Sequence, residues 1–392
     1  MNIIVAYFEN LTHVVGGLEK VICDFSNEFD RRGHHVTIVT FDQSEGRPYY
    51  PLTENVQVIN LREKNYVRLT GIEKIIRELW RLFGKKAVRQ WKWQWKRRHG
   101  VTAFQKIVKS SNPDVIVSLE PMTSAEILSE GITVPLISSL QNDPSTQFRY
   151  FTALEKQALA GSAAVHVLMP SFAQVVKRFV SQKNVVWIPN VIPQYADPAD
   201  LGREKEVYRI VNVARLNKKQ KQQGILIDAF ALLADKYPKW IVEFWGGDTS
   251  HYREELEQKI RRYHLENRVF LKGVTQDVEQ VYKSADIFAF PSKSEGFGLA
   301  LGEAMSAGLP AVGFASCPAV NELIRNGENG ILCAEGIKEF STALETLMKS
   351  PEKRIQMGLR GKAMMRRYAY NCVWGQWEEL LCNIAGNRKQ PL

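Results

Sequence analysis

The segment at residues 291–310, PSKSEGFGLALGEAMSAGLP, combines residue types that can bind a phosphorylated ligand. An apolar run precedes it, and its glycine-containing loop leads into a helix-forming stretch, which predicts a strand, a loop and a helix start. Free backbone N–H groups and the helix dipole make such a start an anion site, and Gly296 and Gly298 let a phosphate approach closely. Glu295 and Glu303 would repel phosphate, so we expect them to bind sugar hydroxyl groups.

Cationic side chains follow a second apolar run, YRIVNVAR at residues 208–215. Cations at the carboxyl end of a parallel strand face the ligand-binding edge of the sheet, and they suit a diphosphate. Arg215 ends the run, and Lys218, Lys219 and Lys221 stand in the loop that follows it. We favour Arg215 and Lys221 as the pair that neutralises a diphosphate.

Two further patterns bear on cofactors. Gly16 and Gly17 precede a helix-forming stretch but lack the full G-x-G-x-x-G spacing, so a nicotinamide cofactor is not indicated, although Asp42 follows the next strand. The chain has no D-x-D pair, the motif that commonly holds a divalent ion against a nucleotide-sugar diphosphate. We therefore expect no metal and no cofactor, with Arg215, Lys221 and the helix start carrying the positive charge.

Strands and helices alternate along the chain and must position these residues. This rhythm predicts an α/β protein of two doubly wound domains that face each other across a cleft. The expected strands lie at 3–8, 35–41, 114–119, 135–139, 165–169, 185–188, 208–215, 240–245, 269–272, 287–291 and 311–314. We place the first domain at 1–189, a proline-containing linker at 190–206, the second domain at 207–366 and a docked terminal helix at 367–392.

Composition narrows the class of protein. Apolar residues make up 45%, and 52 Lys and Arg against 42 Asp and Glu give a net charge of +10, as in an ordinary globular protein. No apolar run approaches the roughly 18 residues of a membrane span, and the first residues do not resemble a signal peptide. Five scattered cysteines and seven unclustered histidines argue against a disulfide framework and a zinc site, and they favour a cytoplasmic location.

The positive charge is concentrated at residues 62–109, which hold 15 Lys and Arg and three acids, a net of +12. Apolar periodicity predicts one basic, tryptophan-rich helix over about 72–98, with Gly84 able to bend it. Tryptophans among cations suit the interface of an anionic membrane. We expect membrane contact from Trp91, Lys92, Trp93, Trp95, Lys96 and Arg97. A helix packed on its own domain and a nucleic-acid site are the alternatives, the latter without any familiar recognition motif.

Several of these segments together resemble the retaining glycosyltransferases of family 4, which have the GT-B fold, and the resemblance covers nearly the whole chain. The matching segments are GGLEKVICDFSNEFDRRGHHVTIVT, VWIPNVI, VARLNKKQK and SEGFGLALGEAMSAGLPAV, the last with an E-x7-E signature and followed by ASCPAVNELIRNGENGIL. The motifs are of the type found in bacterial cell-surface polysaccharide and lipid-linked glycan enzymes. In this family the terminal helix crosses back to the first domain, which we expect here of residues 367–387.

The resemblance implies roles for individual residues. Glu303 would bind the ribose hydroxyls, and Glu295 would hold the transferred sugar near its reacting carbon. Arg215 and Lys221 would neutralise the diphosphate. The remaining donor contacts would come from the backbone N–H groups of Phe297, Gly298 and Leu299, from Gly16 and Gly17 of the first domain, and from the stretch 268–273 along the base, which ends at Gly273.

One departure from the family concerns the first domain. Relatives often carry a histidine after the strand at 135–139, where this chain has Leu140-Gln-Asn-Asp-Pro144. Gln141, Asn142 or Asp143 would then contact the sugar or the acceptor, and His13 near the glycine pair is a further candidate. His166 lies in a strand and is expected in the core.

The function implied is transfer of a sugar, with retention, from a nucleotide sugar, most simply a UDP-sugar, to a lipid-linked or surface glycan. Its expected location is cytoplasmic and peripheral on the inner membrane, with an anionic membrane surface as partner and no nucleic acid. The alternatives are a GT-B nucleotide-sugar epimerase, a glycosidase using the two glutamates, and a nucleic-acid-binding protein with a retired enzyme fold. The anion site beside the carboxylates argues against the glycosidase.

Overall fold

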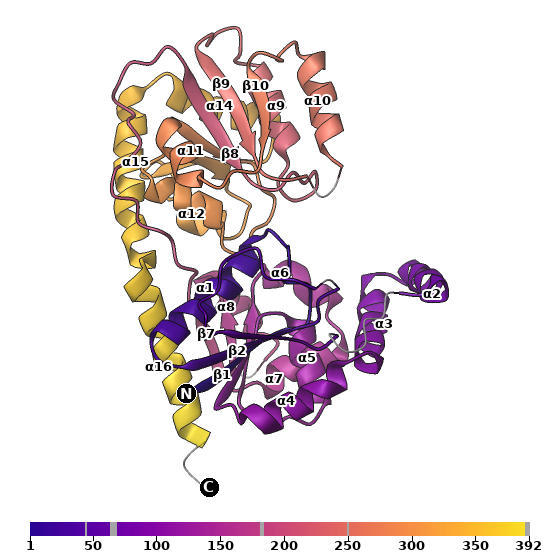
Figure 1. Cartoon of the computed structure of the whole chain (residues 1–392). Coiled ribbons are helices and arrows are strands. Elements are labelled where there is room, and N and C mark those ends of the chain that lie inside the picture. The colour runs from indigo at the N-terminus through magenta and orange to yellow at the C-terminus, as the bar shows by residue number, and fades with distance from the viewer. Residues whose placement is uncertain (44, 63–68, 181–183, 249–250, 389–392) are drawn as a thin grey trace. The chain divides into compact units, whose positions relative to one another are not determined.

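The computed structural model describes the whole chain except residues 44, 63–68, 181–183, 249–250 and 389–392. The chain divides into two compact units. The first comprises Met1–Pro189 together with Trp374–Leu392, and the second comprises Asn190–Val373. Each unit is built on one parallel sheet with helices on its faces (Figure 1).

The first unit contains a seven-stranded sheet in the order β3-β2-β1-β4-β5-β6-β7. All its neighbouring strands run parallel, with Ile3 of β1 paired to Val36 on one side and Val115 on the other. The strands are near-continuous apolar runs because helices cover both faces of such a sheet. Their bounds are β1 Asn2–Tyr7, β2 His35–Thr40, β3 Gln57–Asn60, β4 Val115–Ser118, β5 Leu136–Leu140, β6 Ala164–Val167 and β7 Val185–Trp187.

Helices of the first unit follow these strands in turn. They are α1 Gly17–Arg31, α2 Gly71–Leu82, α3 Lys85–Arg98, α4 Phe104–Ser111, α5 Pro121–Ser129, α6 Pro144–Gln147, α7 Ala153–Gly161 and α8 Pro170–Val176, with 3-10 turns at Val101–Ala103 and Phe148–Tyr150. The terminal helix α16, Tyr370–Arg388, packs on α1. Trp377 lies against Phe25 with ring centroids 5.2 Å apart, and Glu378 pairs with Arg32.

The second unit repeats the architecture with six parallel strands in the order β10-β9-β8-β11-β12-β13. The strands are β8 Tyr208–Val213, β9 Trp240–Trp245, β10 Val269–Gly273, β11 Ile287–Phe290, β12 Ala311–Phe314 and β13 Gly330–Cys333. The helices are α9 Gln223–Ala231, α10 Arg253–Arg262, α11 Val278–Ser284, α12 Leu299–Ser306, α13 Val320–Leu323, α14 Ile337–Met348 and α15 Pro351–Met365, with a 3-10 turn at Arg366–Tyr368. The predicted doubly wound α/β class is confirmed.

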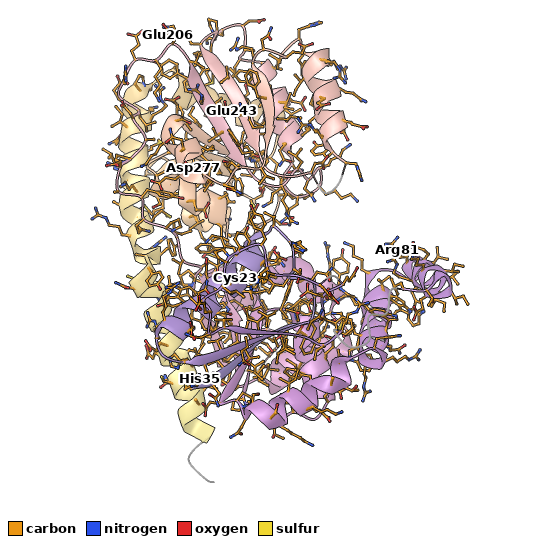
Figure 2. All side chains as sticks on the ribbon, viewed as in Figure 1. Cys23, His35, Arg81, Glu206, Glu243 and Asp277 are labelled. Atoms are coloured by element: carbon orange, nitrogen blue, oxygen red, sulfur yellow. The ribbon has the colours of Figure 1, made fainter. Side chains whose placement is uncertain are left out.

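The basic segment differs from its prediction. Instead of one helix over 72–98 there are two, α2 and α3, because Gly84 adopts a left-handed backbone with φ of 89° and ends the first. α2 projects from the body of the first unit (Figure 1), and Arg81, labelled in Figure 2, lies in its last turn.

The cations of α3 are turned toward acids of their own unit. Lys96 is only 2% exposed, and its Nζ donates to the Glu9 carboxylate at 2.7 Å and lies 3.6 Å from Glu126. Lys92 donates to the same Glu9 at 2.6 Å, and Arg97 donates to Glu130 at 3.0 Å. Burial would raise the pKa of Glu9, but Lys96 and Lys92 outweigh it and hold that pKa at about 2.

The membrane prediction is therefore wrong for Lys96, and for the other five residues it stays a prediction. Trp95 packs on the hydrophobic core of the first unit, and its Nε1 donates to Glu73 at 2.9 Å. Trp91 and Trp93 are partly buried, like Lys92, and Arg97 pairs with a buried carboxylate. These charges fasten α3 to the domain, which is the plainer of the interpretations that the sequence allows.

His166 lies in the core as expected, and it makes the first unit sensitive to acid. It is 1% exposed, hydrogen-bonds to the Ser139 hydroxyl at 2.6 Å and lies 2.7 Å from the Ile188 carbonyl. Burial lowers its pKa to about 4, so the unfolded chain binds a proton at a higher pH than the folded one does. Stability should fall as the pH drops below 6.5, by about 2 kcal/mol at pH 5.

Urea unfolding at pH 7 and pH 5 measures this loss. His166→Gln should show a pH dependence smaller by that amount, whereas the exposed His13→Gln should keep the full dependence. If wild type, His166→Gln and His13→Gln all lost the same free energy of unfolding between pH 7 and pH 5, His166 would not be the source of the pH dependence.

Candidate active site

The switch point of the second sheet lies between β8 and β11. The chain leaves β8 toward β9 and leaves β11 toward β12, so the loops after these two strands diverge and leave a crevice at their carboxyl ends. Two hydrogen bonds hold the loops together. The Lys293 N–H donates to the Gln220 carbonyl at 2.8 Å, and the Gln220 side chain donates to the Ser294 carbonyl at 3.0 Å.

Lys221 and Glu295 meet on these loops. The Lys221 Nζ donates to a Glu295 carboxylate oxygen at 2.6 Å, with 15% and 8% of the two side chains exposed. The Asn217 carboxamide accepts from two backbone N–H groups of the loop, which shapes the turn before Lys221. The Lys221 ammonium can bind an anionic ligand while the Glu295 carboxylate, which holds it in place, binds hydroxyl groups.

The other lysines of this loop are placed differently. Lys218 and Lys219 are exposed, and Lys218 pairs with Glu255 on the surface. The preference for Lys221 over its two neighbours is consistent with this geometry.

Arg215 follows β8 and its side chain is exposed. Among the residues that the structure describes, no ion pair engages its guanidinium. The backbone beside it is tightly held: the Ala214 N–H donates to Trp245 at 2.9 Å and the Leu216 N–H donates to Gly247 at 2.9 Å. Any Cβ at Gly246 would overlap the Ala214 carbonyl oxygen, so a glycine is required there. Arg215 is thus a free cation on a rigid base.

The predicted helix start is α12. Gly298 precedes it with a left-handed φ of 84°, which a glycine adopts without strain. Phe297 is 3% exposed and lies edge-on to Tyr368, with ring centroids 5.5 Å apart, so the loop is anchored. The first N–H groups of any helix have no partner within it, and here Leu299 begins the helix.

Glu303 lies one turn inside α12. One of its carboxylate oxygens accepts a hydrogen bond from the Tyr282 hydroxyl at 3.1 Å. Tyr282 is fully buried, and burial, with Glu303 beside it, raises its pKa well above the ordinary value, so the hydroxyl stays a donor. No sequence pattern points to Tyr282 as the residue that orients Glu303.

Gly273 ends the edge strand β10 and is linked to the site through the backbone. Its carbonyl accepts from the Gly246 N–H at 2.7 Å, and Gly246 adjoins Arg215 through Ala214. The structure therefore gathers Arg215, Lys221, Glu295 and the α12 start around the switch point, with Gly273 at its border.

The remaining predicted residues belong to the first unit. Gly16 caps α1 and Gly17 is its first residue, while His13 is exposed in the preceding loop. Gln141 donates to the Ser139 hydroxyl at 2.7 Å and Asn142 is exposed. Their contacts with a ligand stay predictions.

Asp143 has a structural use. It is 3% exposed, and it caps α6 by accepting from the backbone and the hydroxyl of Ser145 at 2.8 and 2.7 Å. Its neighbours Gln141 and Asn142 are therefore the better candidates for the missing histidine's role.

Comparison with known families covers both units. A family model described as "Glycosyl transferase 4-like domain" matches residues 16–191, and one described as "Glycosyl transferases group 1" matches residues 194–364. The chain belongs to the family 4 glycosyltransferases. In this chain the cations, the helix start and the two glutamates at 215–303 lie wholly within the group 1 match.

Two relatives show how far the likeness extends. A Haemophilus influenzae protein named "Uncharacterized glycosyltransferase" is 32% identical over 199 residues, 50% of this chain and 55% of that one. The chain thus spans about half the length of that relative. The amylovoran biosynthesis glycosyltransferase AmsD of Erwinia amylovora is 23% identical over 93% of this chain and 96% of its own.

Solved structures establish the fold. HepE of Anabaena, solved in complex with UDP-glucose, superposes with a TM-score of 0.71 over 97% of this chain and 99% of that one, at 19% identity. Likeness at this identity shows the GT-B fold alone. No helix among the described residues is both long enough and apolar enough to cross a bilayer.

Proposed function

We propose that this enzyme transfers a sugar from a UDP-sugar, with retention and without a metal, to a lipid-linked or cell-surface glycan at the cytoplasmic face of the membrane. One observation is the main support for a nucleotide-sugar donor. The Lys221–Glu295 pair, 2.6 Å apart, lies at the sheet's switch point, where ligands of such folds bind. The UDP-glucose bound to HepE and the amylovoran biosynthesis named for AmsD support the donor and acceptor classes.

The chemistry follows from charge. As the bond between the sugar carbon and the diphosphate oxygen breaks, negative charge grows on the leaving diphosphate. Lys221, Arg215 and the N–H groups at the α12 start would stabilise that charge in place of a metal. The acceptor hydroxyl would form the new bond on the face that the diphosphate leaves, and the leaving oxygen would take its proton. Catalysis is then positioning and charge stabilisation.

Donor recognition predicts a specific loss in Glu303→Ala. In a thermal-shift series with UDP-, GDP- and ADP-sugars, the wild-type protein should respond to the UDP-sugars. Glu303→Ala should lose that response because the carboxylate that would bind the ribose hydroxyls is removed. Glu303→Gln, which keeps an acceptor for Tyr282, should recover part of it. Glu328→Ala, an exposed acid on the same unit, is the matched control. A full response from Glu303→Ala would overturn the ribose assignment.

Two measurements test the remaining parts. Turnover with a lipid-linked acceptor should survive an excess of chelator, and the anomeric configuration of the product, read by NMR, should match that of the donor. Turnover that ends with chelation would disprove metal independence, and an inverted product would disprove retention. Sugar isomerisation without acceptor would favour the epimerase instead.

A further inference from the structure

Helix α2 presents an apolar face that no described residue of its own unit buries. A capping box at Thr70 and Glu73 starts the helix, and none of its residues is buried. Its apolar side chains recur at helical spacing, so they share one face. That face consists of Ile72, Ile75, Ile76, Leu79, Leu82 and Phe83, which are 37–80% exposed. A contiguous exposed apolar surface of this kind marks a place where another apolar phase makes contact.

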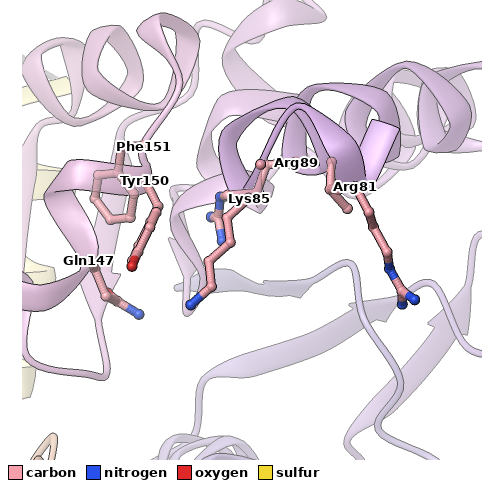
Figure 3. Close-up of a pocket in the computed structure, with 8 residues that line it drawn as sticks. Arg81, Lys85, Arg89, Gln147, Tyr150 and Phe151 are labelled. Carbon is pink, nitrogen blue, oxygen red and sulfur yellow. The ribbon is translucent and has the colours of Figure 1, made fainter. Parts of the chain in front are cut away.

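A pocket adjoins the end of this helix. It has a volume of about 620 Å³ and lies between the α2–α3 junction and the short segment that follows α6. Cations and aromatic rings form most of its wall, and Figure 3 shows Lys85 extending from α3 toward the side that carries Tyr150 and Gln147. The residues that matter here are Arg81, Lys85, Arg89, Gln147, Tyr150 and Phe151.

The cations of this pocket differ in how firmly they are held. Arg89 is bound by the buried Glu155 and by Glu120, so it serves as a fixed wall. Lys85 lies 4.5 Å from the ring centroid of Tyr150, and no carboxylate within the described part of the chain pairs with it. Arg81 pairs only with an exposed acid on its own helix, a contact that contributes little. Two cations are thus available to an anion.

An unpaired amide points to a ligand as well. The Gln147 carbonyl oxygen is buried, and no hydrogen-bond partner for it exists among the described residues. Buried polar groups are nearly always hydrogen-bonded, so an unpaired one in a pocket wall indicates a missing partner. Figure 3 shows the amide nitrogen of Gln147 on the side that faces Lys85, so a phosphate beside Lys85 would accept hydrogen bonds from both side chains.

We propose that α2 lies in the interface of an anionic bilayer and that the pocket at its end binds the phosphate head group of a membrane lipid. The cations and the apolar face would then bind the same lipid layer. The cations would contact the phosphate groups, and the apolar side chains of α2 would contact the hydrocarbon chains beneath them. The inference rests on the proposed function for its role, because a lipid-linked acceptor presents this same phosphate to the enzyme.

The charge of this region favours a membrane, rather than a second copy of the chain, as the partner of the apolar face of α2. Residues 71–98 hold ten Lys and Arg and two acids, and the α3 cations among them are largely spent on fastening the hairpin. A second copy of the chain would bring like charges together at this face and be repelled. An anionic lipid surface is attracted by the cations that no described acid engages, Lys74, Lys85, Lys86 and Arg98. Trp80 lies at the border of the apolar face, where tryptophan is favoured.

Flotation of the full chain with vesicles tests the apolar face. Vesicles of phosphatidylcholine with about 30 mol % phosphatidylglycerol should carry the protein at low salt. The triple change Ile75→Gln, Leu79→Gln and Leu82→Gln should weaken binding roughly tenfold or more, because exposed positions alter the surface without disturbing the fold. The matched control replaces Leu232, Ile337 and Leu359, which are exposed to similar degrees elsewhere, with Gln. Unbound wild-type protein, or equal losses in both triples, would overturn the inference.

The pocket is tested separately with Lys85→Gln and Gln147→Leu. Each should weaken binding to phosphatidylglycerol vesicles severalfold, while Lys349→Gln, an exposed lysine outside the pocket, should not. Inorganic phosphate added at constant ionic strength separates the two sources of the anion. Vesicle binding that depends on Lys85 supports a lipid head group even where free phosphate competes for the same cation. A protein that binds free phosphate through Lys85, but whose vesicle binding is equal in wild type and Lys85→Gln, overturns the lipid assignment.

Failure of this inference can be told from failure of the proposed function. The donor thermal shift uses the second unit and no lipid. A triple variant that loses vesicle binding but keeps its UDP-sugar response supports the membrane role of α2. If the wild-type protein responds to UDP-sugars but does not bind vesicles, the membrane inference alone is overturned. If it binds vesicles but responds to no nucleotide sugar, the proposed function alone is overturned.

Discussion

Replacing Lys221 with alanine should lower the rate of sugar transfer by about 10²–10³-fold, the usual cost of removing one preorganised group that stabilises a growing charge. Lys221 is held 2.6 Å from Glu295, so its ammonium is in place before the reaction begins. The loss should appear mainly in kcat, because the diphosphate gains most of its charge in the transition state. Steady-state kinetics with a lipid-linked acceptor measures it.

Variants of the same loop and of Glu295 show whether the loss of rate is specific to Lys221. Lys218→Ala removes an exposed lysine three residues away and should retain nearly full activity. Lys221→Arg keeps the charge and should recover part of the rate. Glu295→Gln should also slow transfer, since it loses both the sugar contact and the carboxylate that orients Lys221. Full activity in Lys221→Ala would remove this residue from the charge-stabilising site.

Replacing Lys96 with methionine should destabilise the first unit by about 3–5 kcal/mol, the usual cost of removing one partner from a buried ion pair. Lys96 donates to the Phe8 carbonyl and to Glu9, and Glu126 lies 3.6 Å away with both carboxylate oxygens buried. Burial raises the pKa of Glu126 to about 8, ahead of the opposing effect of Lys96. Urea unfolding at neutral pH measures the loss.

A second lysine of the same helix separates burial from charge. Lys86→Met removes an equal charge from an exposed position on α3, and it should change the free energy of unfolding by less than about 0.5 kcal/mol. If Lys96→Met were as stable as wild type and only its vesicle binding fell, Lys96 would be a membrane contact after all. Stability lost at position 96 alone places that side chain in the interior.

The alternation of apolar runs and helical periods was enough to predict the two parallel sheets and most of their strands. Strands β3, Gln57–Asn60, and β13, Gly330–Cys333, escaped because each is a short, partly exposed strand at the edge of its sheet. The site around Arg215, Lys221 and α12 was also predictable, since a strand's carboxyl end and the glycine before a helix are local features. What the sequence could not tell was that Tyr282 orients Glu303 or that Gly246 lets the backbone beside Arg215 close up.

Helices α2 and α3 show most clearly what the sequence determined and what only the tertiary structure decided. Residue types and spacing determined that residues 71–98 would be helical, amphipathic and strongly positive, because those properties depend on neighbours within a few turns. Which cations face inward was decided only by the tertiary structure, since the partners of Lys96 and Arg89 stand 87 and 66 residues away in the chain. An ion pair between distant residues leaves no periodic trace in a sequence. Folding therefore pairs four α3 cations, Arg89, Lys92, Lys96 and Arg97, with acids of the domain, and among the described residues it leaves the apolar side of α2 exposed.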